Sequence, residues 1–274
     1  MPITKRPARS WPITGSRLRT EPFAPGELSL DAFLGGRLSI AQPLSGYRAG
    51  VDPVLLAASV PARPGETVLD LGCGAGVAAL CLAARVPGLR LWGLEIQPGY
   101  AALARQNAAR NGLAMEVMTG DVAAMPAELR ARQFDHVMLN PPFFDRARST
   151  PARDAGREGA MGEALPLCRW IEAAARRAAP GGHVCVIHRA GRLADLLGAM
   201  AARLGSVELL PLIPRRGRAA RLVLVRARKG GRAALRLCDG WLLHEGAQHG
   251  QDGENYTRST ASVLRDAAEL PFCR

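Results

Sequence analysis

Four consecutive residues could recognise and activate a planar amino group. The segment Asn140-Pro141-Pro142-Phe143 directly follows an apolar stretch, residues 134–139, that predicts a buried strand. The two prolines hold the backbone away from helix and remove two amide donors, so the turn presents carbonyl acceptors. The Asn140 side-chain oxygen and the Pro141 carbonyl can each accept one N–H of an amino group, which would aim the nitrogen lone pair at an electrophile.

The residues after this turn suit an aromatic ring and its phosphates. Phe143 offers a flat face on which a nucleic-acid base could stack, and Phe144 could pack behind it. The loop that follows carries arginines that could contact phosphate groups: Arg146, Arg148, Arg153 and Arg157. The alternative is a proline-rich turn with two core aromatic residues and a solvated, charged loop.

A second cluster, Asp70-Leu71-Gly72-Cys73-Gly74-Ala75-Gly76, predicts a cofactor-binding loop. It ends the predicted strand 67–71 and opens onto a helix-like stretch, residues 75–86. Glycines here would let a ligand lie against the backbone around Gly72, Cys73 and Gly74. Asp70 could orient an ammonium group or accept hydrogen bonds from the loop itself. Dinucleotide-binding folds share this pattern, so the rest of the sheet must decide between them.

Acids follow the next two predicted strands, residues 89–94 and 115–118. Glu95, with Ile96 beside it, could accept both hydroxyls of a ribose. Asp121, with Val122 beside it, could accept the amino group of an adenine. Ligands of open α/β sheets bind at the carboxyl ends of strands, where both acids lie.

The cofactor predicted from these positions is S-adenosylmethionine, which has an adenine, a ribose and an ammonium group. A nicotinamide dehydrogenase would use the same ribose acid. Its phosphate loop, however, prefers Gly-x-Gly-x-x-Gly, and Ala75-Gly76-Val77 does not supply that pattern.

The order of predicted elements indicates an α/β, Rossmann-like fold with helices on both faces of a sheet. Strand-like and helix-like stretches alternate from residue 67 to a fifth strand at 184–188. The last two strands, 207–213 and 221–225, are joined by a turn too short for a crossover helix, so they predict an antiparallel hairpin. The result is the seven-stranded, mostly parallel sheet of class I methyltransferases.

The N-terminal part of the chain is expected to form a tail and a cap. Residues 1–27 are basic and proline-rich and predict a flexible tail, which leaves one domain at 28–274. Its first part, 28–64, would form a cap segment. There Asp52 is expected to be the N-cap of a helix that starts at Pro53, and the turn before it, which contains Tyr47 and Arg48, could close over the cofactor or base.

The charge of the chain favours a polyanionic partner such as nucleic acid. The formal net charge is +12, and 34 of the 36 basic residues are arginine. The strong bias toward Arg, Ala and Gly is also what coding bias would produce, so charge alone does not identify the partner.

The cysteines and the apolar segments of the sequence indicate the expected redox state and cellular compartment. The six cysteines are scattered, without Cys-x-x-Cys or zinc-finger spacing, so we expect reduced, mostly buried thiols and no metal site. No run of 18 apolar residues and no signal-peptide pattern is present, which argues against a membrane protein and makes the cytoplasm the expected compartment. The oligomeric state is not indicated, and a monomer is the default expectation.

Together these residues resemble a known family, the bacterial class I methyltransferases that modify N6 of the adenine beside the anticodon of valine tRNA. The resemblance runs from about Leu28 to the end of the chain. The segments that carry it are Asp31–Leu38, Gln42-Pro43, Gly46–Pro53, the Asp70 loop, Asn140–Phe144, Tyr256-Thr257 and Val263–Arg265.

The resemblance implies valine tRNA as substrate and S-adenosylmethionine as methyl donor. It assigns Asn140, Pro141 and Phe143 to catalysis or base binding. It assigns the cofactor site to Asp70, Gly72, Glu95 and Asp121, and it matches Tyr47 and Arg48 without giving them a defined role.

Several alternatives fit the same residues. Asn-Pro-Pro-aromatic turns also occur in methyltransferases that act on protein glutamine, on rRNA guanine and on DNA adenine, because each substrate presents a planar amino group. The basic loop after Phe144 argues against a release-factor-type glutamine methyltransferase. A non-catalytic RNA-binding module with a fossil cofactor fold is the non-enzymatic alternative, against which the intact acids and Asn140 argue.

Overall fold

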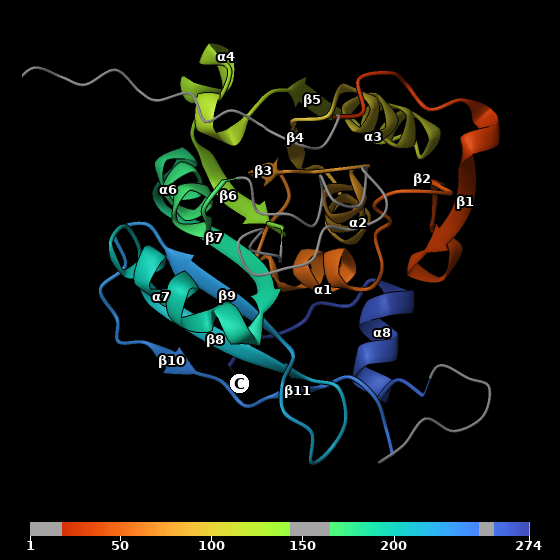
Figure 1. The fold of residues 1–274 in the computed structure, drawn as a ribbon. Helices are drawn as coiled ribbons and strands as arrows, with labels where there is room; N and C mark the ends of the chain where they lie inside the picture. The colour runs from red at the N-terminus through yellow and green to blue at the C-terminus, as the bar shows by residue number, and fades with distance from the viewer. Residues whose placement is uncertain (1–17, 143–164, 247–254, 274) are drawn as a thin grey trace, which may run out of the picture.

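The computed structural model of the chain, shown in Figure 1, describes residues 18–142, 165–246 and 255–273. The strands in these ranges are β1 (Leu28–Phe33), β2 (Leu38–Pro43), β3 (Thr67–Leu71), β4 (Arg90–Glu95), β5 (Met115–Thr119), β6 (Phe134–Leu139), β7 (Ala178–Arg189), β8 (Gly205–Ile213), β9 (Leu222–Arg228), β10 (Arg236–Leu237) and β11 (Trp241–Leu242). The α-helices are α1 (Asp52–Ser59), α2 (Val77–Arg85), α3 (Pro98–Arg110), α4 (Ala127–Arg130), α6 (Leu167–Arg177), α7 (Leu193–Ala201) and α8 (Arg258–Asp266). Short 3-10 helices are η1 (Pro25–Glu27), η2 (Leu34–Gly36), η3 (Val122–Ala124) and η4 (Ala190–Arg192).

The central sheet has the mostly parallel topology that the sequence predicts. Its order is β10-β8-β9-β7-β6-β3-β4-β5, and β11 also pairs with β8. β9 is antiparallel to both β7 and β8, whereas the pairs β6–β7, β3–β6, β3–β4 and β4–β5 are parallel. The two-residue strands β10 and β11 extend the expected seven strands to nine in the described chain. They were not predicted because two residues are too few to show a pattern.

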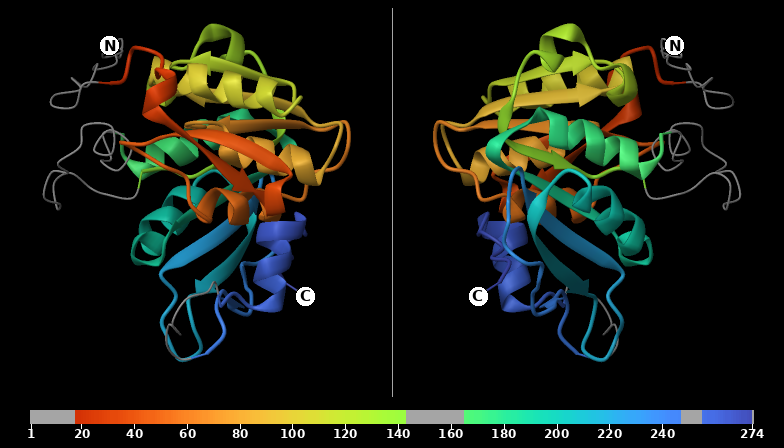
Figure 2. Two further views of the ribbon diagram at one scale, coloured as in Figure 1. Left: turned by 90° about the vertical axis from the view of Figure 1, so that its right-hand side faces the viewer. Right: turned by 90° about the vertical axis from the view of Figure 1, so that its left-hand side faces the viewer.

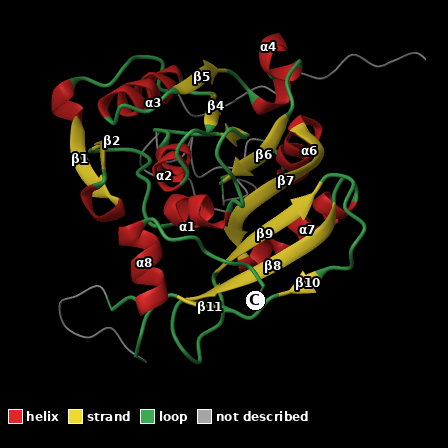
Figure 3. Cartoon of the chain, turned by 180° about the vertical axis from the view of Figure 1, so that it is seen from behind, coloured by secondary structure: helices red, strands yellow, loops and turns green. Residues whose placement is uncertain are grey.

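Helices cover both faces of this sheet, as Figures 2 and 3 show. Side chains alternate between the faces along each strand, because successive residues of a strand point in opposite directions. Met138 packs into the core beneath α1, α2 and α3, while its neighbours Val137 and Leu139 pack into the core beneath α6 and α7. The sheet is therefore buried on both sides, and its strand ends are where polar side chains can act.

The cap segment contains a small second sheet. β1 and β2 pair as an antiparallel hairpin, with Leu30 opposite Ala41. Ile40 of β2 is fully buried in the same core as α1 and α2, so the hairpin is packed onto the main domain. In Figure 1 this hairpin lies beside α3, at the side of the molecule opposite α6.

Part of the predicted flexible tail is ordered, which corrects that expectation for residues 18–27. The Arg19 backbone N–H donates to Gln97 Oε1 at 3.2 Å, and the Gly99 N–H donates to the Arg19 carbonyl at 3.0 Å. Arg19 also pairs with Glu27 at 2.7 Å. Gln97 and Gly99 lie at the start of α3, far along the chain, so local sequence could not indicate these two contacts. Residues 1–17 lie outside the described part.

The helix start at Asp52 also differs from the prediction. α1 begins at Asp52 itself, with Val51 as the cap residue and no side-chain capping bond. Pro53 is the second helical residue. The carboxyl group of Asp52 is therefore left for other partners, and burial raises its pKa while nearby Arg189 lowers it.

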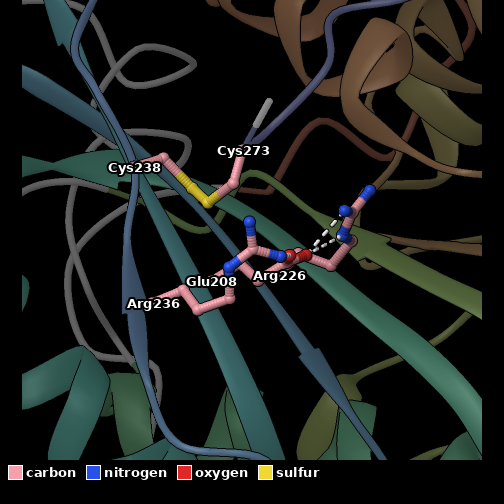
Figure 4. Close-up of a disulfide and its surroundings, with 5 residues drawn as sticks. All are labelled: Glu208, Arg226, Arg236, Cys238 and Cys273. Carbon is pink, nitrogen blue, oxygen red and sulfur yellow. Dashed lines mark hydrogen bonds and ion pairs between the residues drawn. A yellow bond between two sulfur atoms is a disulfide. The ribbon is translucent and has the colours of Figure 1, made fainter.

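Two cysteines form a disulfide, so the expectation that all six are reduced is wrong. Cys238 and Cys273 are bonded, with their Cα atoms 5.0 Å apart and a separation of 35 positions in the sequence. Figure 4 shows this bond close to the paired side chains of Glu208 and Arg226. The C-terminal segment returns to the sheet edge, and the wide sequence separation hid that pairing. Cys73, Cys81, Cys168 and Cys185 are free, and Cys168 among them is exposed.

None of the helices in the described ranges has the length and apolar character needed to cross a membrane. Within the same ranges, no three His, Cys, Asp or Glu side chains gather where they could hold a metal ion.

Candidate active site

The Asp70 loop and the Asn140 turn lie side by side at one edge of the sheet. They follow β3 and β6, which pair in parallel with Leu71 opposite Leu139. Since parallel strands end at the same edge, the two predicted halves of the site become neighbours. Topology thus joins segments that are about seventy residues apart in the sequence.

The backbone of the glycine loop is folded tightly against β4. The N–H groups of Gly72 and Cys73 both donate to the Leu94 carbonyl, at 2.7 and 3.1 Å. Gly72 and Gly74 adopt φ values of +73° and +54°, which residues with a Cβ atom rarely adopt. A Cβ on Gly72 would also lie 3.0 Å from the Trp170 ring. Cys73 contributes backbone only, because its side chain packs toward Gly93.

Asp70 is a buried carboxyl group with one unused oxygen. The side chain is 3% exposed, and its Oδ2 atom has no hydrogen-bond partner among the described residues. Burial raises the pKa of Asp70 to about 7, while a hydrogen bond from the Ala79 backbone opposes the rise. A buried carboxylate with a free oxygen is a favourable place for a cationic group.

Glu95, which was predicted to bind a ribose, accepts hydrogen bonds from the backbone of the glycine loop and of the following turn. Its Oε2 accepts the Gly74 N–H at 3.0 Å, and its Oε1 accepts the Gln97 N–H at 2.9 Å. Burial raises the pKa of Glu95, and backbone N–H groups, that of Ile96 included, oppose the rise. Each carboxylate oxygen can accept a further hydrogen bond, so ribose binding remains compatible with these contacts.

Asp121 is positioned by the short helix that it starts. Its Oδ1 accepts the Ala123 N–H at 2.8 Å, as the cap of η3, whose first residue is Val122. The cap fixes the direction of the carboxylate at the end of β5, two strands from Asp70. Its second oxygen is available for a ligand.

The Asn140 turn keeps a buried acceptor. Asn140 Oδ1 has no hydrogen-bond partner among the described residues, although its surroundings exclude solvent from it. Pro141 is buried and Pro142 is partly buried. The predicted site residues Phe143, Phe144, Arg146 and Arg148 lie outside the described residues.

Tyr47 and Arg48 occupy different environments. The Tyr100 hydroxyl accepts the Tyr47 N–H at 2.9 Å and contacts its carbonyl at 3.2 Å, which fixes the turn. Burial, together with the charges of Asp52 and Asp70, raises the pKa of Tyr47. A Cβ on Gly74 would lie 3.8 Å from the Tyr47 ring, so this ring borders the cofactor loop.

Arg48 instead binds the cap hairpin. Its guanidinium donates to Asp31 Oδ2 at 2.6 Å, to the Pro43 carbonyl at 2.7 Å and to Ser29 Oγ at 2.8 Å. These three contacts give Arg48 a clear structural role in tying the turn to β1 and β2. The sequence suggested substrate binding for it, which stays a prediction.

Two further residues of the site were not singled out in the sequence. Trp170 on α6 places its ring over Gly72, and its Nε1 donor is buried without a partner among the described residues. Asn107 on α3 is fully buried and joins β2 to the glycine loop through bonds to the Ala41 and Ala75 carbonyls, both 3.0 Å long. The available signal for Asn107 was its position on the same face of the helix as the apolar residues Leu103 and Ala104.

The two histidines near the site strands differ in position. His136 lies at the start of β6, where its Nε2 contacts Glu66 at 2.7 Å and its ring stacks on His183. It is therefore a scaffold residue at the edge opposite Asn140. His188 lies at the end of β7, and burial lowers its pKa to about 4, so it is neutral at pH 7.

The family of the chain follows from comparison with known proteins. The sequence pattern of the methyltransferase small domain matches residues 49–210, which include the Asp70 loop and the Asn140 turn. The chain belongs to this family. This methyltransferase is also 34% identical over 181 residues to the tRNA1(Val) (adenine(37)-N6)-methyltransferase of Porphyromonas gingivalis, a match that covers 60% of the chain and 69% of the relative.

A relative with the same printed name, from Yersinia enterocolitica, is 36% identical over 124 residues, with 44% of the chain and 48% of the relative covered. The family resemblance predicted from the sequence motifs is thereby confirmed.

Solved structures agree with the fold. A predicted O-methyltransferase from Agrobacterium tumefaciens aligns with a TM-score of 0.65 and 26% identity, over 80% of this chain and 98% of that one. The Thermus thermophilus 16S rRNA N2 G1207 methyltransferase, solved with AdoMet and guanosine, aligns with a TM-score of 0.53 and 20% identity, over 74% and 50% of the two chains. The expected Rossmann-like class I architecture is confirmed.

Proposed function

We propose that this methyltransferase transfers a methyl group from S-adenosylmethionine to N6 of an adenine in tRNA, the adenine beside the anticodon of valine tRNA. The proposal rests on two buried oxygens without a hydrogen-bond partner among the described residues, Asp70 Oδ2 and Asn140 Oδ1. They lie near the ends of two strands, β3 and β6, that pair with each other. One suits a cationic cofactor group and the other suits an N–H donor. The names of the relatives supply the RNA and the nucleotide.

The residues at the end of β3, β4 and β5 fit the proposed cofactor. Asp70 would bind the methionyl ammonium, Glu95 the ribose hydroxyls and Asp121 the adenine amino group. Gly72 and Gly74 adopt positive φ angles that glycine allows, so the loop can turn tightly at the end of β3, where the cofactor would bind. When bound, S-adenosylmethionine supplies an electrophilic methyl carbon.

The Asn140 turn would prepare the acceptor nitrogen. The amino lone pair of adenine is delocalised into the ring, so the free base is a poor nucleophile. Asn140 Oδ1 and the Pro141 carbonyl would each accept one N–H and direct the lone pair toward the methyl group. Phe143 is proposed as the face on which the flipped base stacks, which is worth about 1–3 kcal/mol in nucleic-acid complexes.

Two acceptors favour nitrogen over oxygen as the methylated atom. The Agrobacterium tumefaciens structure is titled a predicted O-methyltransferase. A hydroxyl has a single O–H and could satisfy only one of Asn140 and Pro141, whereas an amino group satisfies both. We therefore propose an amino acceptor for this chain.

We propose the cytoplasm as the compartment and tRNA as the partner, since the proposed substrate is cytoplasmic. A monomer without a bound metal is the expected working form.

The function is tested by incubating the purified chain with labelled S-adenosylmethionine and an unmodified valine tRNA transcript. Label in N6-methyladenosine, absent when the anticodon-adjacent adenine is replaced by guanine, is the expected result. A parallel reaction contains a release factor in place of RNA. Label in the protein only, or in RNA irrespective of that adenine, would contradict the proposed substrate.

A further inference from the structure

The loop between β8 and β9 carries a group of arginines that the proposed active site does not use. Arg216, Arg218 and Arg221 are exposed, and within the described part of the chain none of their side chains has a hydrogen bond or ion pair. We call these three residues the arginine edge. In Figure 1 the loop lies at the far end of β8, beside β11.

The arginine edge lies on the same side of the sheet as Asn140. β8 runs parallel to β7 and β6, because both β8 and β7 are antiparallel to β9. The loop after Ile213 therefore leaves the sheet at the edge where Asn140 leaves β6. Its second end is fixed there as well, since the Ala190 N–H donates to the Arg221 carbonyl at 2.9 Å and Arg189 pairs with Leu222.

The separation suits one extended RNA ligand. Neighbouring strands are about 5 Å apart, so β9 and β8 lie about 10 and 15 Å from β6 across the sheet. A base held at Asn140 would therefore have its neighbouring phosphates within reach of arginine side chains on the β8–β9 loop.

The base of the loop is anchored rather than free. Arg215 is 7% exposed, and its guanidinium donates to the Glu245 carbonyl and, at 3.5 Å, to that of Gly246. The three arginines beyond it thus extend from a fixed point.

Charged groups around the loop leave the edge positive. Arg189 is exposed at the end of β7, and Asp52 lies near enough for Arg189 to lower its pKa. Asp195 is paired with Arg192 at 2.7 Å. Glu245 is the exposed acid whose backbone contacts Arg215. Six arginines and three acids therefore lie around this loop, and two of the acids, Asp52 and Asp195, lie beside arginines outside the arginine edge.

We propose that the arginine edge binds the phosphate backbone of the substrate RNA next to the flipped base. Guanidinium groups bind phosphate through paired N–H donors, and they release counterions when they do so. This inference rests on the proposed function, because it names the surface by which the same site holds its RNA.

The test compares two triple variants that lose the same charge. One replaces the arginine edge (Arg216→Ala, Arg218→Ala, Arg221→Ala). The other replaces three exposed arginines that also lack side-chain partners in the described residues but lie at the opposite edge of the sheet: Arg63→Ala, Arg130→Ala and Arg232→Ala. Affinity for unmodified valine tRNA transcript is measured from 50 to 300 mM salt, alongside affinity for S-adenosylmethionine.

The edge variant is expected to bind tRNA about 10-fold or more weakly at moderate salt. Its log–log salt slope should fall by about 2 to 3, since each lost phosphate contact removes about one unit. Cofactor affinity should stay unchanged in both variants. Replacing the same three residues by lysine should restore most of the salt slope, because charge is kept.

Equal tRNA affinity and salt slope in the edge variant and the wild type would overturn the inference. An equal loss in the control variant would also overturn it, since the effect would then come from net charge. Failure of the proposed function gives a different result: the wild-type chain would not methylate tRNA at all. Binding of the arginine edge to a release factor but not to tRNA would assign this surface to a protein partner instead.

Discussion

Asp70 and Asn140 stand at the ends of two paired strands, and each keeps one buried side-chain oxygen without a partner among the described residues. Buried polar atoms are normally hydrogen-bonded, because an unsatisfied acceptor costs about 1–3 kcal/mol. Two such atoms at one sheet edge fit two donor groups, one on the proposed cofactor and one on the proposed substrate. One donor group would be cationic and the other a neutral amine.

Replacing Asn140 by alanine should abolish most methyl transfer while leaving cofactor binding nearly intact. Loss of one positioned polar group in a catalytic site costs about 100- to 1000-fold in rate. We expect a fall of this size in single-turnover transfer to tRNA, with an S-adenosylmethionine Kd within about threefold of wild type by calorimetry. The matched control is Asn111→Ala, at the end of α3, where Asn111 bonds to Ser39 of β2. This variant should transfer the methyl group at the wild-type rate. An Asn140 variant with normal turnover would rule out the lone-pair alignment.

Cofactor affinity should depend on pH through Asp70. Its pKa is raised to about 7 by burial, so the carboxyl group is largely protonated below that pH and ionised above it. Because the Asp70 carboxylate binds the ammonium form of the cofactor's α-amino group, affinity for S-adenosylmethionine should rise between pH 6 and 7. It should fall above about pH 8, where the α-amino group loses its proton. Asp70→Asn should bind more weakly at pH 7 and show no rise between pH 6 and 7. A wild-type affinity that falls between pH 6 and 7 would contradict this role.

The raised pKa of Asp70 should also make the stability of the cofactor-free protein depend on pH. The folded chain holds the Asp70 proton more tightly than the unfolded chain, whose pKa is near 3.8. The Asp70 contribution to the free energy of unfolding therefore decreases as pH rises from about 4 to about 7. Urea unfolding of wild type and Asp70→Asn at several pH values isolates this term, and the difference between them should grow with pH. A constant difference would show that Asp70 does not titrate in this range.

The backbone at Gly72 should tolerate no side chain. Gly72 has a φ of +73°, and a Cβ there would meet the Trp170 ring at 3.0 Å. Gly72→Ala should therefore weaken S-adenosylmethionine binding by about 10-fold or more, through both backbone strain and displacement of the ring. Gly65 is the matched control, because its φ is +89° but an added Cβ would meet nothing within 4 Å.

Gly65→Ala should lower the free energy of unfolding by about 1–2 kcal/mol and leave cofactor affinity unchanged. Equal effects of the two variants on cofactor affinity would show that the contact with Trp170 is unimportant.

The Cys238–Cys273 disulfide should stabilise the fold. A bond that closes a loop of this length, with the cysteines 35 positions apart, contributes about 2–4 kcal/mol in the loop-entropy description. Adding reductant to the wild type, or replacing both cysteines by serine, should lower the free energy of unfolding by that amount in urea. The double variant should no longer respond to reductant. Cys168→Ser, at an exposed free cysteine, should match the wild type.

Strong periodicity and turn residues made the core of the fold predictable. The strands at Phe134–Leu139 and at Thr67–Leu71 have the expected bounds. Both elements have a clear apolar pattern, and both are followed directly by residues that favour turns, glycine or proline among them. β7 starts at Ala178, earlier than predicted, because its first residues include a proline and two glycines that read as a turn.

The sequence by itself determined the chemistry of the individual residues. A carboxylate before a glycine loop, acids after the next two strands and an amide before two prolines have fixed donor and acceptor properties wherever they lie. The tertiary structure decided which of these groups meet. Parallel pairing of β3 with β6 puts the loop after β3 beside the Asn140 turn, and α6 brings Trp170 over Gly72.

The tertiary structure also gave Arg48 a scaffold partner in Asp31 and joined Cys238 to Cys273. These contacts depend on sheet order and on how the chain ends return to the domain. Both are set by long-range packing of buried faces, which leaves no local signal in the residues it brings together.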